Sequence, residues 1–96
     1  MDAGDIYRAD LNEEVSRRVL VVSVRQFHRL SGRALVVPEF RIPVGDVEPP
    51  WHLDIDGVVF AVDMLRSVTV DRLVERDGRC PAAAMANVRR VLQHIT

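Results

Sequence analysis

The pattern of hydrophobic and polar positions predicts short β-strands through the first half of the chain. Residues 5–10 (DIYRAD) alternate with the period of two that a half-buried strand shows. Residues 18–24 (RVLVVSV) form a continuous β-branched run, which is typical of a strand buried on both faces. Residues 33–40 (RALVVPEF) resume strand composition until Pro38, which has no N–H to donate to a neighbouring strand. Residues 25–32 break the pattern, with Ser31-Gly32 as a turn signal.

The next part of the chain predicts a loop, a hairpin and further extended segments. Residues 41–50 contain three prolines and one glycine, so we expect an exposed loop. The stretch that follows predicts two strands joined by a hairpin turn at Asp56-Gly57, and then a third extended piece at residues 67–70. Residues 71–80 predict a turn or helical step and leave room for one more strand.

The C-terminal segment predicts an amphipathic helix. A second turn signal, Asp77-Gly78, precedes it, and Pro81 suits the first helical position because that position needs no N–H donor. Apolar residues then recur at spacings of three and four, which gives the helix one apolar face. Strands followed by one helix indicate an α+β, mainly β architecture, or a small barrel, in a single domain over residues 1–96. The apolar positions of the helix are Met85, Val88, Leu92 and Ile95.

Charge is nearly balanced overall but uneven along the chain. The formal net charge is −1, which argues against a surface that coats nucleic acid through many phosphate contacts. Five arginines nevertheless fall between Arg17 and Arg33, with no acidic residue among them. All 13 basic residues are arginine, the side chain best suited to planar, bidentate contacts with phosphate. A local anion-binding patch is therefore compatible with the sequence.

Several function classes lack their usual signals. The uncharged run at residues 19–24 is far too short to cross a membrane, and the polar, acidic first 15 residues do not resemble a signal peptide, so we expect a cytoplasmic protein. Cys80 is the only cysteine, which excludes an internal disulfide or a cysteine-based zinc cluster. Phosphate-binding glycine loops and zinc-protease or serine-hydrolase motifs are not found. We expect no metal and no cofactor.

Three charged positions are candidates for chemistry. Arg17 and Arg18 border a buried strand, where a guanidinium group could hold a phosphate; alternatively, both pair with the glutamates that precede them in the chain. Asp63 interrupts an apolar strand, and a buried ionised carboxylate without a partner is costly. It is therefore either a base or orienting acceptor beside Arg17, or one half of a structural pair with Arg66.

The order of segments resembles the MazF/PemK family of toxins from toxin-antitoxin pairs. The matching pieces are GDIYRADL, RRVLVVS, RALVVP, DGVVFAVDMLRSV and MANVRRVLQHI, which together span nearly the whole chain. The resemblance implies a small SH3-like antiparallel barrel with a C-terminal helix. It further implies a homodimeric, sequence-specific and metal-independent endoribonuclease (an mRNA interferase) that cleaves single-stranded RNA and is inhibited by a cognate antitoxin.

The resemblance also implies roles for particular residues. The functional arginine of the family matches Arg17, which would contact the scissile phosphate, and Arg18 takes the position of the family's proline. Glu39 and Asp63 are the carboxylates available near the inferred site as proton acceptors. Other arginines would follow the RNA backbone, and phenylalanines would stack on bases. These further RNA-binding candidates are Arg18, Arg25, Phe27, Arg29, Arg33 and Phe40.

One departure from the family pattern keeps two other functions open. Phe40 stands at the end of the third strand, where the family usually has threonine or serine. A catalytically inactive relative that only binds RNA or an antitoxin is therefore one alternative. The other is a DNA gyrase inhibitor like CcdB, which shares the fold, although that protein ends in Trp-Gly-Ile and this chain ends in LQHIT.

Overall fold

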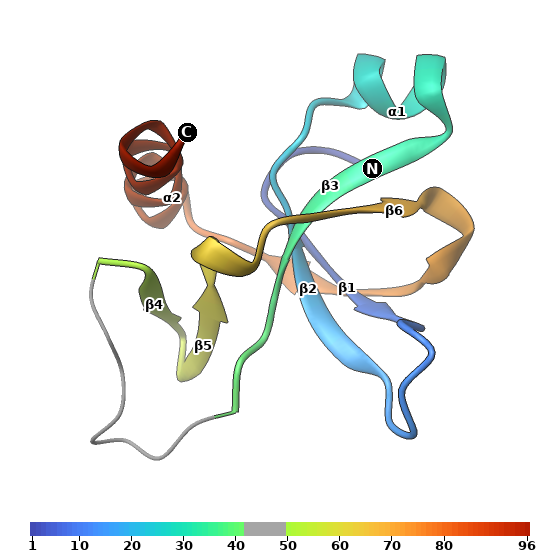
Figure 1. Ribbon diagram of the computed structural model, residues 1–96, viewed down its shortest axis with the longest axis horizontal. Helices are drawn as coiled ribbons and strands as arrows, with labels where there is room; N and C mark the ends of the chain where they lie inside the picture. Colours follow the sequence, from blue (N-terminus) through green and yellow to red (C-terminus); the bar gives the residue numbers. More distant parts are fainter. Residues whose placement is uncertain (42–49) are drawn as a thin grey trace.

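The computed structural model describes residues 1–41 and 50–96, and it consists mainly of antiparallel strands with a C-terminal helix (Figure 1). This confirms the mainly β class expected from the sequence. Most of the predicted loop, residues 42–49, lies outside the described residues. The elements in chain order are β1 (Asp5–Ala9), β2 (Arg17–Val21), α1 (Arg25–Ser31), β3 (Arg33–Pro38), β4 (His52–Ile55), β5 (Val58–Ala61), η2 (Val62–Met64), β6 (Arg66–Thr69), η3 (Val70–Arg72), β7 (Leu73–Arg79) and α2 (Ala82–Ile95), where η marks a 3₁₀ turn.

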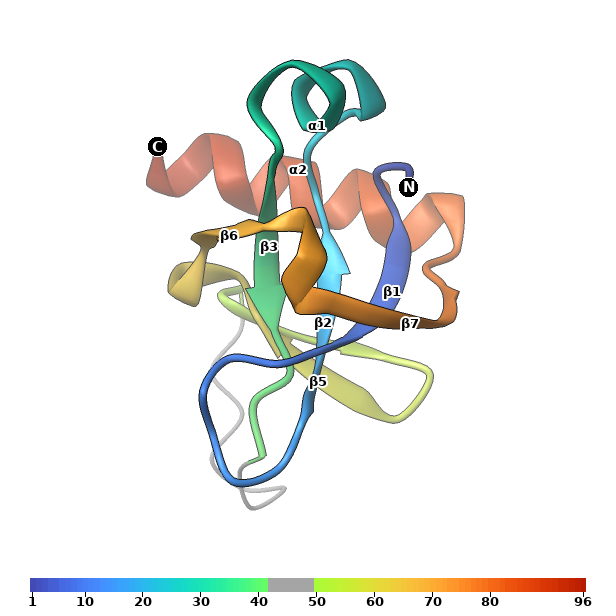
Figure 2. The same cartoon turned by 90° about the vertical axis from the view of Figure 1, so that its right-hand side faces the viewer.

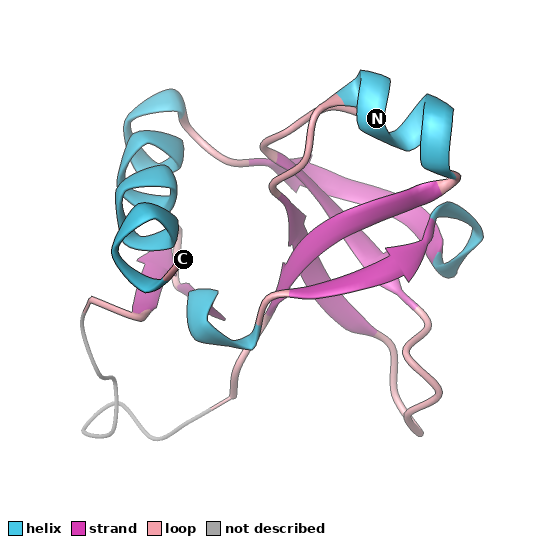
Figure 3. Ribbon diagram, turned by 45° about the horizontal axis from the view of Figure 1, so that its top comes forward, coloured by secondary structure: helices cyan, strands magenta, loops and turns pink. Residues whose placement is uncertain are grey.

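Five strands form one antiparallel sheet in the order β6-β3-β2-β1-β7, and β4 and β5 form a separate hairpin. A single bridge between Glu39 and Phe60 links the hairpin to the chain that follows β3. The sheet curls on itself (Figure 3) but is not the closed barrel expected from the sequence, because β6 and β7 both remain edge strands. η3 turns the chain between these two strands, so β6 pairs with β3 and β7 pairs with β1.

β2 and β3 are buried on both faces, as their continuous apolar runs predict. Side chains alternate across a strand, so Leu20 and Val37 join one hydrophobic cluster, while Val19 and Val21 join another on the opposite face. All four are fully buried, and each contributes about 1.5–3 kcal/mol to folding. α2 crosses behind the sheet in Figure 2 and covers the first cluster. The residues that it buries there are Met85, Val88 and Val91.

The helix and the hairpin turn predicted from the sequence are confirmed. α2 begins directly after Pro81, and its apolar face is the predicted one except at the end, where Ile95 is 39% exposed. The hairpin turns at Asp56 and Gly57, whose φ angles of 53° and 84° are those of a tight turn between strands. No helix in the described part of the chain is long and apolar enough to span a membrane.

Two segments differ from the prediction, although the chain does turn at Gly32 as expected. Residues 25–31 form the helix α1, which ends where Gly32 takes a φ of 69° and donates its N–H to the carbonyl of His28. Seven residues are too few to show a helical period in the sequence. Asp77-Gly78 was predicted as a turn but lies inside β7. The pairing of β7 with β1 shifts in register there, as at a β-bulge.

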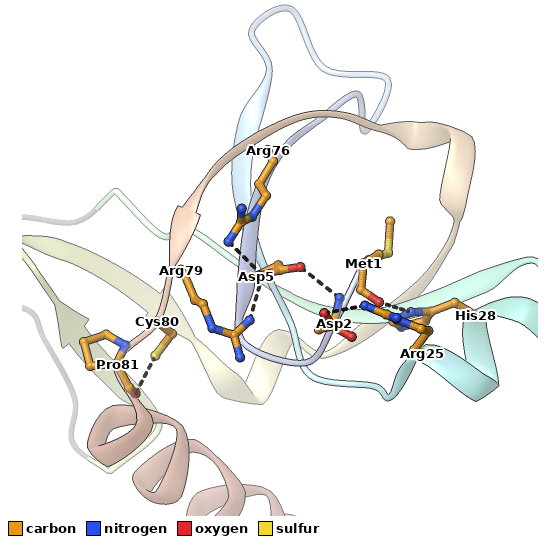
Figure 4. A network of polar contacts seen from close by, with 9 residues as sticks. All are labelled: Met1, Asp2, Asp5, Arg25, His28, Arg76, Arg79, Cys80 and Pro81. Carbon is orange, nitrogen blue, oxygen red and sulfur yellow. Dashed lines mark hydrogen bonds and ion pairs between the residues drawn. The ribbon is translucent and has the colours of Figure 1, made fainter.

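A buried carboxylate ties β1 to β7 (Figure 4). Asp5 is 5% exposed; its carboxylate accepts hydrogen bonds from the guanidinium of Arg79 and the N–H of Asp2, both over 2.8 Å, and lies 3.4 Å from Arg76. Burial raises the pKa of Asp5, but these hydrogen bonds and positive charges outweigh it and leave the pKa below its ordinary value. The carboxylate is therefore ionised at neutral pH and holds the two strands together.

Candidate active site

One cavity brings together three of the predicted site residues. β2 and β3 are antiparallel neighbours, so Arg17 at the start of β2 lies close to the residues that follow β3. The N–H of Glu39 donates to the carbonyl of Arg18 over 2.8 Å, which continues this pairing beyond the strand. The cavity, called here the Arg17 cavity, has a volume of about 280 Å³. Its lining residues are Glu13, Val15, Ser16, Arg17, Glu39, Phe40 and Arg41.

The Arg17 guanidinium is held by a carboxylate from the loop between β1 and β2. Its Nη2 donates to Oε2 of Glu13 over 2.6 Å. Both side chains are partly exposed, and such pairs contribute little to stability because water screens them. The contact confirms the expected pairing with a preceding glutamate for Arg17, whereas the same expectation is wrong for Arg18, which pairs with Glu39. The contact with Glu13 orients the Arg17 guanidinium and so sets the direction of its other N–H groups.

Glu39 lies deeper in the same wall and binds Arg18 twice. Its carboxylate is 2.9 Å from Nη2 of Arg18 and accepts the backbone N–H of the same residue over 3.3 Å. Burial raises the pKa of Glu39, but the two hydrogen bonds and the charges of Arg18 and Arg41 outweigh burial and leave the pKa below its ordinary value. Glu39, which is 7% exposed, is therefore an ionised carboxylate beside the cavity at neutral pH.

Asp63 lies elsewhere than the sequence suggested. It sits in the 3₁₀ turn η2 rather than within a strand, and 48% of its side chain is exposed. Its carboxylate lies 3.8 Å from Nε2 of His52, so the basic side chain that approaches it is this histidine and not Arg17 or Arg66. The carboxylate is not costly there, because water reaches it.

His52 is a site neighbour that the sequence analysis did not single out. Its ring contacts that of Phe40, with ring centroids 5.1 Å apart, and thereby joins the Arg17 cavity wall to Asp63. The hairpin turn at Asp56-Gly57 could have predicted this contact. Counting outward from the turn pairs His52 with Ala61, which places the histidine at the open end of the hairpin, near Asp63.

The remaining predicted RNA-binding residues lie at the opposite end of β2. Arg25, Phe27 and Arg29 belong to α1, which follows the C-terminal end of the strand, whereas Arg17 begins it (Figure 1). Arg25 donates to the carboxylate of Asp2 over 2.8 Å (Figure 4). The arginines that cluster in the sequence are therefore divided between the two ends of one strand.

The described residues contain no group of three or more histidine, cysteine, aspartate or glutamate side chains that could hold a metal ion. Cys80 is buried in the core beneath α2. Burial and the negative charge of Asp56 raise the pKa of its thiol, against a smaller opposing effect of Arg79. Because the thiolate is the reactive form, this cysteine behaves as a packing residue at neutral pH.

Comparison with known families identifies the chain. The profile of the PemK-like, MazF-like toxins of type II toxin-antitoxin systems matches residues 2–96. The chain belongs to this family. The resemblance noted in the sequence is thereby confirmed over almost the entire length of this MazF-like toxin. No curated protein matches the chain.

Solved structures share the fold of this MazF-like toxin. A MazE-MazF complex from Deinococcus radiodurans superposes with a TM-score of 0.83 at 22% identity, over 99% of this chain and 93% of that one. An endoribonuclease bound to its cognate antitoxin, from a mycobacterial species, gives 0.84 at 18% identity, over 98% and 92%. The Mycobacterium tuberculosis toxin MazF-mt6 gives 0.73 at 18% identity, over 94% and 93%. At these identities the likeness establishes the fold.

Proposed function

We propose that this toxin is an endoribonuclease that cleaves single-stranded RNA in the Arg17 cavity. The observation that carries the proposal is the position of Arg17. This arginine is the one that matches the functional arginine of the family, and it lines a cavity between the start of β2 and the end of β3. Family membership and the fold shared with an endoribonuclease support the same reaction.

The reaction proposed is attack by a ribose 2′-OH on the neighbouring phosphate. The 2′-oxygen forms a bond to phosphorus, the bond to the 5′-oxygen breaks, and the products are a 2′,3′-cyclic phosphate and a 5′-hydroxyl. Negative charge grows on the phosphoryl oxygens during this step, and the Arg17 guanidinium stabilises it through N–H groups that do not contact Glu13. Since an arginine supplies the positive charge, we propose that the reaction is independent of metal ions.

Proton transfer needs an acceptor for the 2′-OH proton. Of the two carboxylates considered from the sequence, Glu39 lines the cavity, whereas Asp63 does not belong to its lining. We assign the acceptor role to Glu39, which is ionised at neutral pH and therefore able to take a proton. Its lowered pKa makes it a weak base, so we expect slow turnover. The leaving 5′-oxygen takes its proton from water.

Phe40 and the arginines supply the contacts that hold the RNA. Phe40 occupies the cavity wall where the family usually has a hydroxyl group, and its ring offers a surface on which a base can stack. Arg25, Phe27 and Arg29 remain predicted RNA contacts for a strand that runs the length of β2. The base chosen at the cleavage site is expected to depend on the shape of the cavity around Phe40.

Two protein partners belong to the proposal. Solved relatives include complexes of a toxin with its antitoxin, and we propose that this chain likewise binds a cognate antitoxin that blocks the RNA site. We also propose that the toxin acts as a homodimer in the cytoplasm. A chain of 96 residues buries a limited core, and association with a second copy adds buried surface.

The test is RNA cleavage in the presence of a metal chelator. Purified toxin is incubated with a long single-stranded RNA and EDTA, alongside Arg17→Ala and the control Arg89→Ala, which removes an exposed arginine of α2. We expect discrete products that carry 2′,3′-cyclic phosphate and 5′-hydroxyl ends. Loss of the charge at position 17 is expected to slow cleavage about 10²- to 10³-fold. Intact RNA with the wild-type protein, or full activity of Arg17→Ala, would contradict the proposal.

A further inference from the structure

A second cavity shares the loop between β1 and β2 with the Arg17 cavity. Residues 13, 15 and 16 of that loop line the Arg17 cavity, and residues 10–12 line the second one, which has a volume of about 260 Å³. Its other walls come from the start of β3, from β6 and from η3. Each of these three elements contributes one arginine, so it is called here the three-arginine cavity. The three arginines are Arg33, Arg66 and Arg72.

Two of the three guanidinium groups are positioned by neutral acceptors. Arg33 donates from Nε to Oγ of Ser67 over 2.7 Å and from Nη2 to the carbonyl of Ser67 over 3.1 Å. Arg72 donates to Oδ1 of Asn12 over 2.9 Å. Asn12 has a φ of 62°, and its N–H bonds to the side chain of Asp10, so a tight turn presents this acceptor. These contacts direct the guanidinium groups without neutralising them.

The charge in the three-arginine cavity is not balanced. Asp10 is the only acidic residue of its lining, and the nearest approach of its carboxylate to Arg72 is 3.9 Å. The side chain of Arg66 is exposed and makes no hydrogen bond or ion pair with any other described residue. Three positive charges around one negative charge give the cavity a positive potential that attracts an anion. The excess charge therefore makes this cavity a candidate anion-binding site.

We propose that the three-arginine cavity binds a backbone phosphate of the RNA next to the one that is cleaved, an inference that rests on the proposed ribonuclease function. Arginine forms planar, bidentate contacts with phosphate, and single-strand binding proteins follow the backbone with positive charge. Consecutive residues of one loop line both cavities, so a strand bound in the Arg17 cavity would follow this loop to reach the second one. The cavity thus extends the RNA site without contacting the scissile bond.

The experiment measures binding of RNA that cannot be cleaved. The dissociation constant of the full chain for a long 2′-O-methyl RNA oligonucleotide is measured against salt concentration for wild type, Arg66→Ala and Arg89→Ala. We expect Arg66→Ala to weaken binding about three- to tenfold at low salt and to reduce the slope of log K against log salt by about 0.7, the value for one phosphate of a single strand. Arg89→Ala removes the same charge far from the cavity and is expected to match wild type.

A second variant changes the charge in the opposite direction. Asp10→Asn keeps an oxygen that can accept the Asn12 N–H while removing the only negative charge, so we expect it to bind RNA more tightly than wild type. Wild-type affinity and salt slope in both Arg66→Ala and Asp10→Asn, or no RNA binding by the wild type, would overturn the proposal. Because the RNA cannot be cleaved, binding is scored separately from cleavage, so either proposal can fail alone.

A peptide probe distinguishes RNA phosphate from protein carboxylates. Poly-glutamate is titrated into the same variants, because an acidic segment of a protein partner could also fit a cavity of three arginines. A loss of affinity in Arg66→Ala that affects poly-glutamate and leaves RNA binding unchanged would assign the cavity to a protein partner and overturn the RNA proposal. The expected result is a loss of RNA affinity.

Discussion

The two cavities on either side of the β1–β2 loop differ in how their arginines are compensated. At the Arg17 cavity, Arg17 and Arg18 each have a carboxylate oxygen close by, at 2.6 and 2.9 Å. In the three-arginine cavity, the closest approach of a carboxylate to an arginine, among the described residues, is 3.9 Å, at Arg72. Paired charges hold side chains in fixed directions, whereas unpaired charges attract an anion. This difference is the basis for proposing chemistry in the first cavity and backbone binding in the second.

Removing the carboxylate that pairs with Arg18 is expected to have the largest effect on the difference between the two cavities. Glu39→Gln leaves the Arg18 guanidinium without a negative partner, so we expect the free energy of unfolding to fall by about 2 kcal/mol. It also removes the proposed proton acceptor, so cleavage should slow while RNA binding tightens. Urea unfolding and the RNA assays measure the three effects.

Glu13→Gln is the matched control for that variant, because it breaks an exposed ion pair of the same kind. We expect a loss of less than about 1 kcal/mol in the free energy of unfolding. Equal destabilisation by the two variants would contradict the view that Glu39 is a buried, structurally important carboxylate.

Phe40→Leu separates stacking from charge, because it removes an uncharged contact with the RNA in the Arg17 cavity. Leucine keeps an apolar side chain but loses the ring, so RNA binding should weaken by about 1 kcal/mol, near the lower limit for loss of one stacked base. The slope of log K against log salt should not change, unlike the slope of Arg66→Ala. A changed slope in Phe40→Leu, or unchanged affinity, would show that the ring does not stack on RNA.

Acid pH is expected to have a smaller effect on stability, through the two buried carboxylates Asp5 and Glu39. The pKa values of Asp5 and Glu39 are lowered in the folded state, so the unfolded chain binds protons more readily than the folded one. Their contribution to stability is complete above the unfolded pKa values of about 4 and is lost as pH falls through the folded values. The urea midpoint should therefore decrease below pH 4.5 or so, and by less in Glu39→Gln. A midpoint that rises on acidification would contradict this assignment.

Much of the fold could be predicted because its strongest signals are local. The continuous run around Leu20, the turn at Asp56-Gly57 and the helical spacing after Pro81 each require one type of structure. The helix α1 could not be predicted, because its seven residues leave little room for a period and only Gly32 marks its end. Closure of the sheet depends on how β6 and β7 are oriented, which no local pattern encodes.

The candidate site was only partly predictable, for a similar reason. Arg17, Glu39 and Phe40 were placed together by the resemblance to the family, and the pairing of β2 with β3 brings them to one cavity. Arg25 was grouped with them by proximity in sequence, but a strand separates the two ends of that stretch in space. The three-arginine cavity draws on residues more than 60 positions apart, from Asp10 to Arg72, and no motif links them.

The most direct test of the division between the two cavities is kcat/KM for RNA cleavage, measured against salt concentration for wild type, Arg17→Ala and Arg66→Ala. The deficit of Arg17→Ala should persist at every salt concentration, because Arg17 stabilises the transition state. The deficit of Arg66→Ala should shrink as salt rises, because the variant has one phosphate contact fewer to lose. Deficits that depend on salt in the same way for both variants would contradict the assignment of chemistry to one cavity and backbone binding to the other.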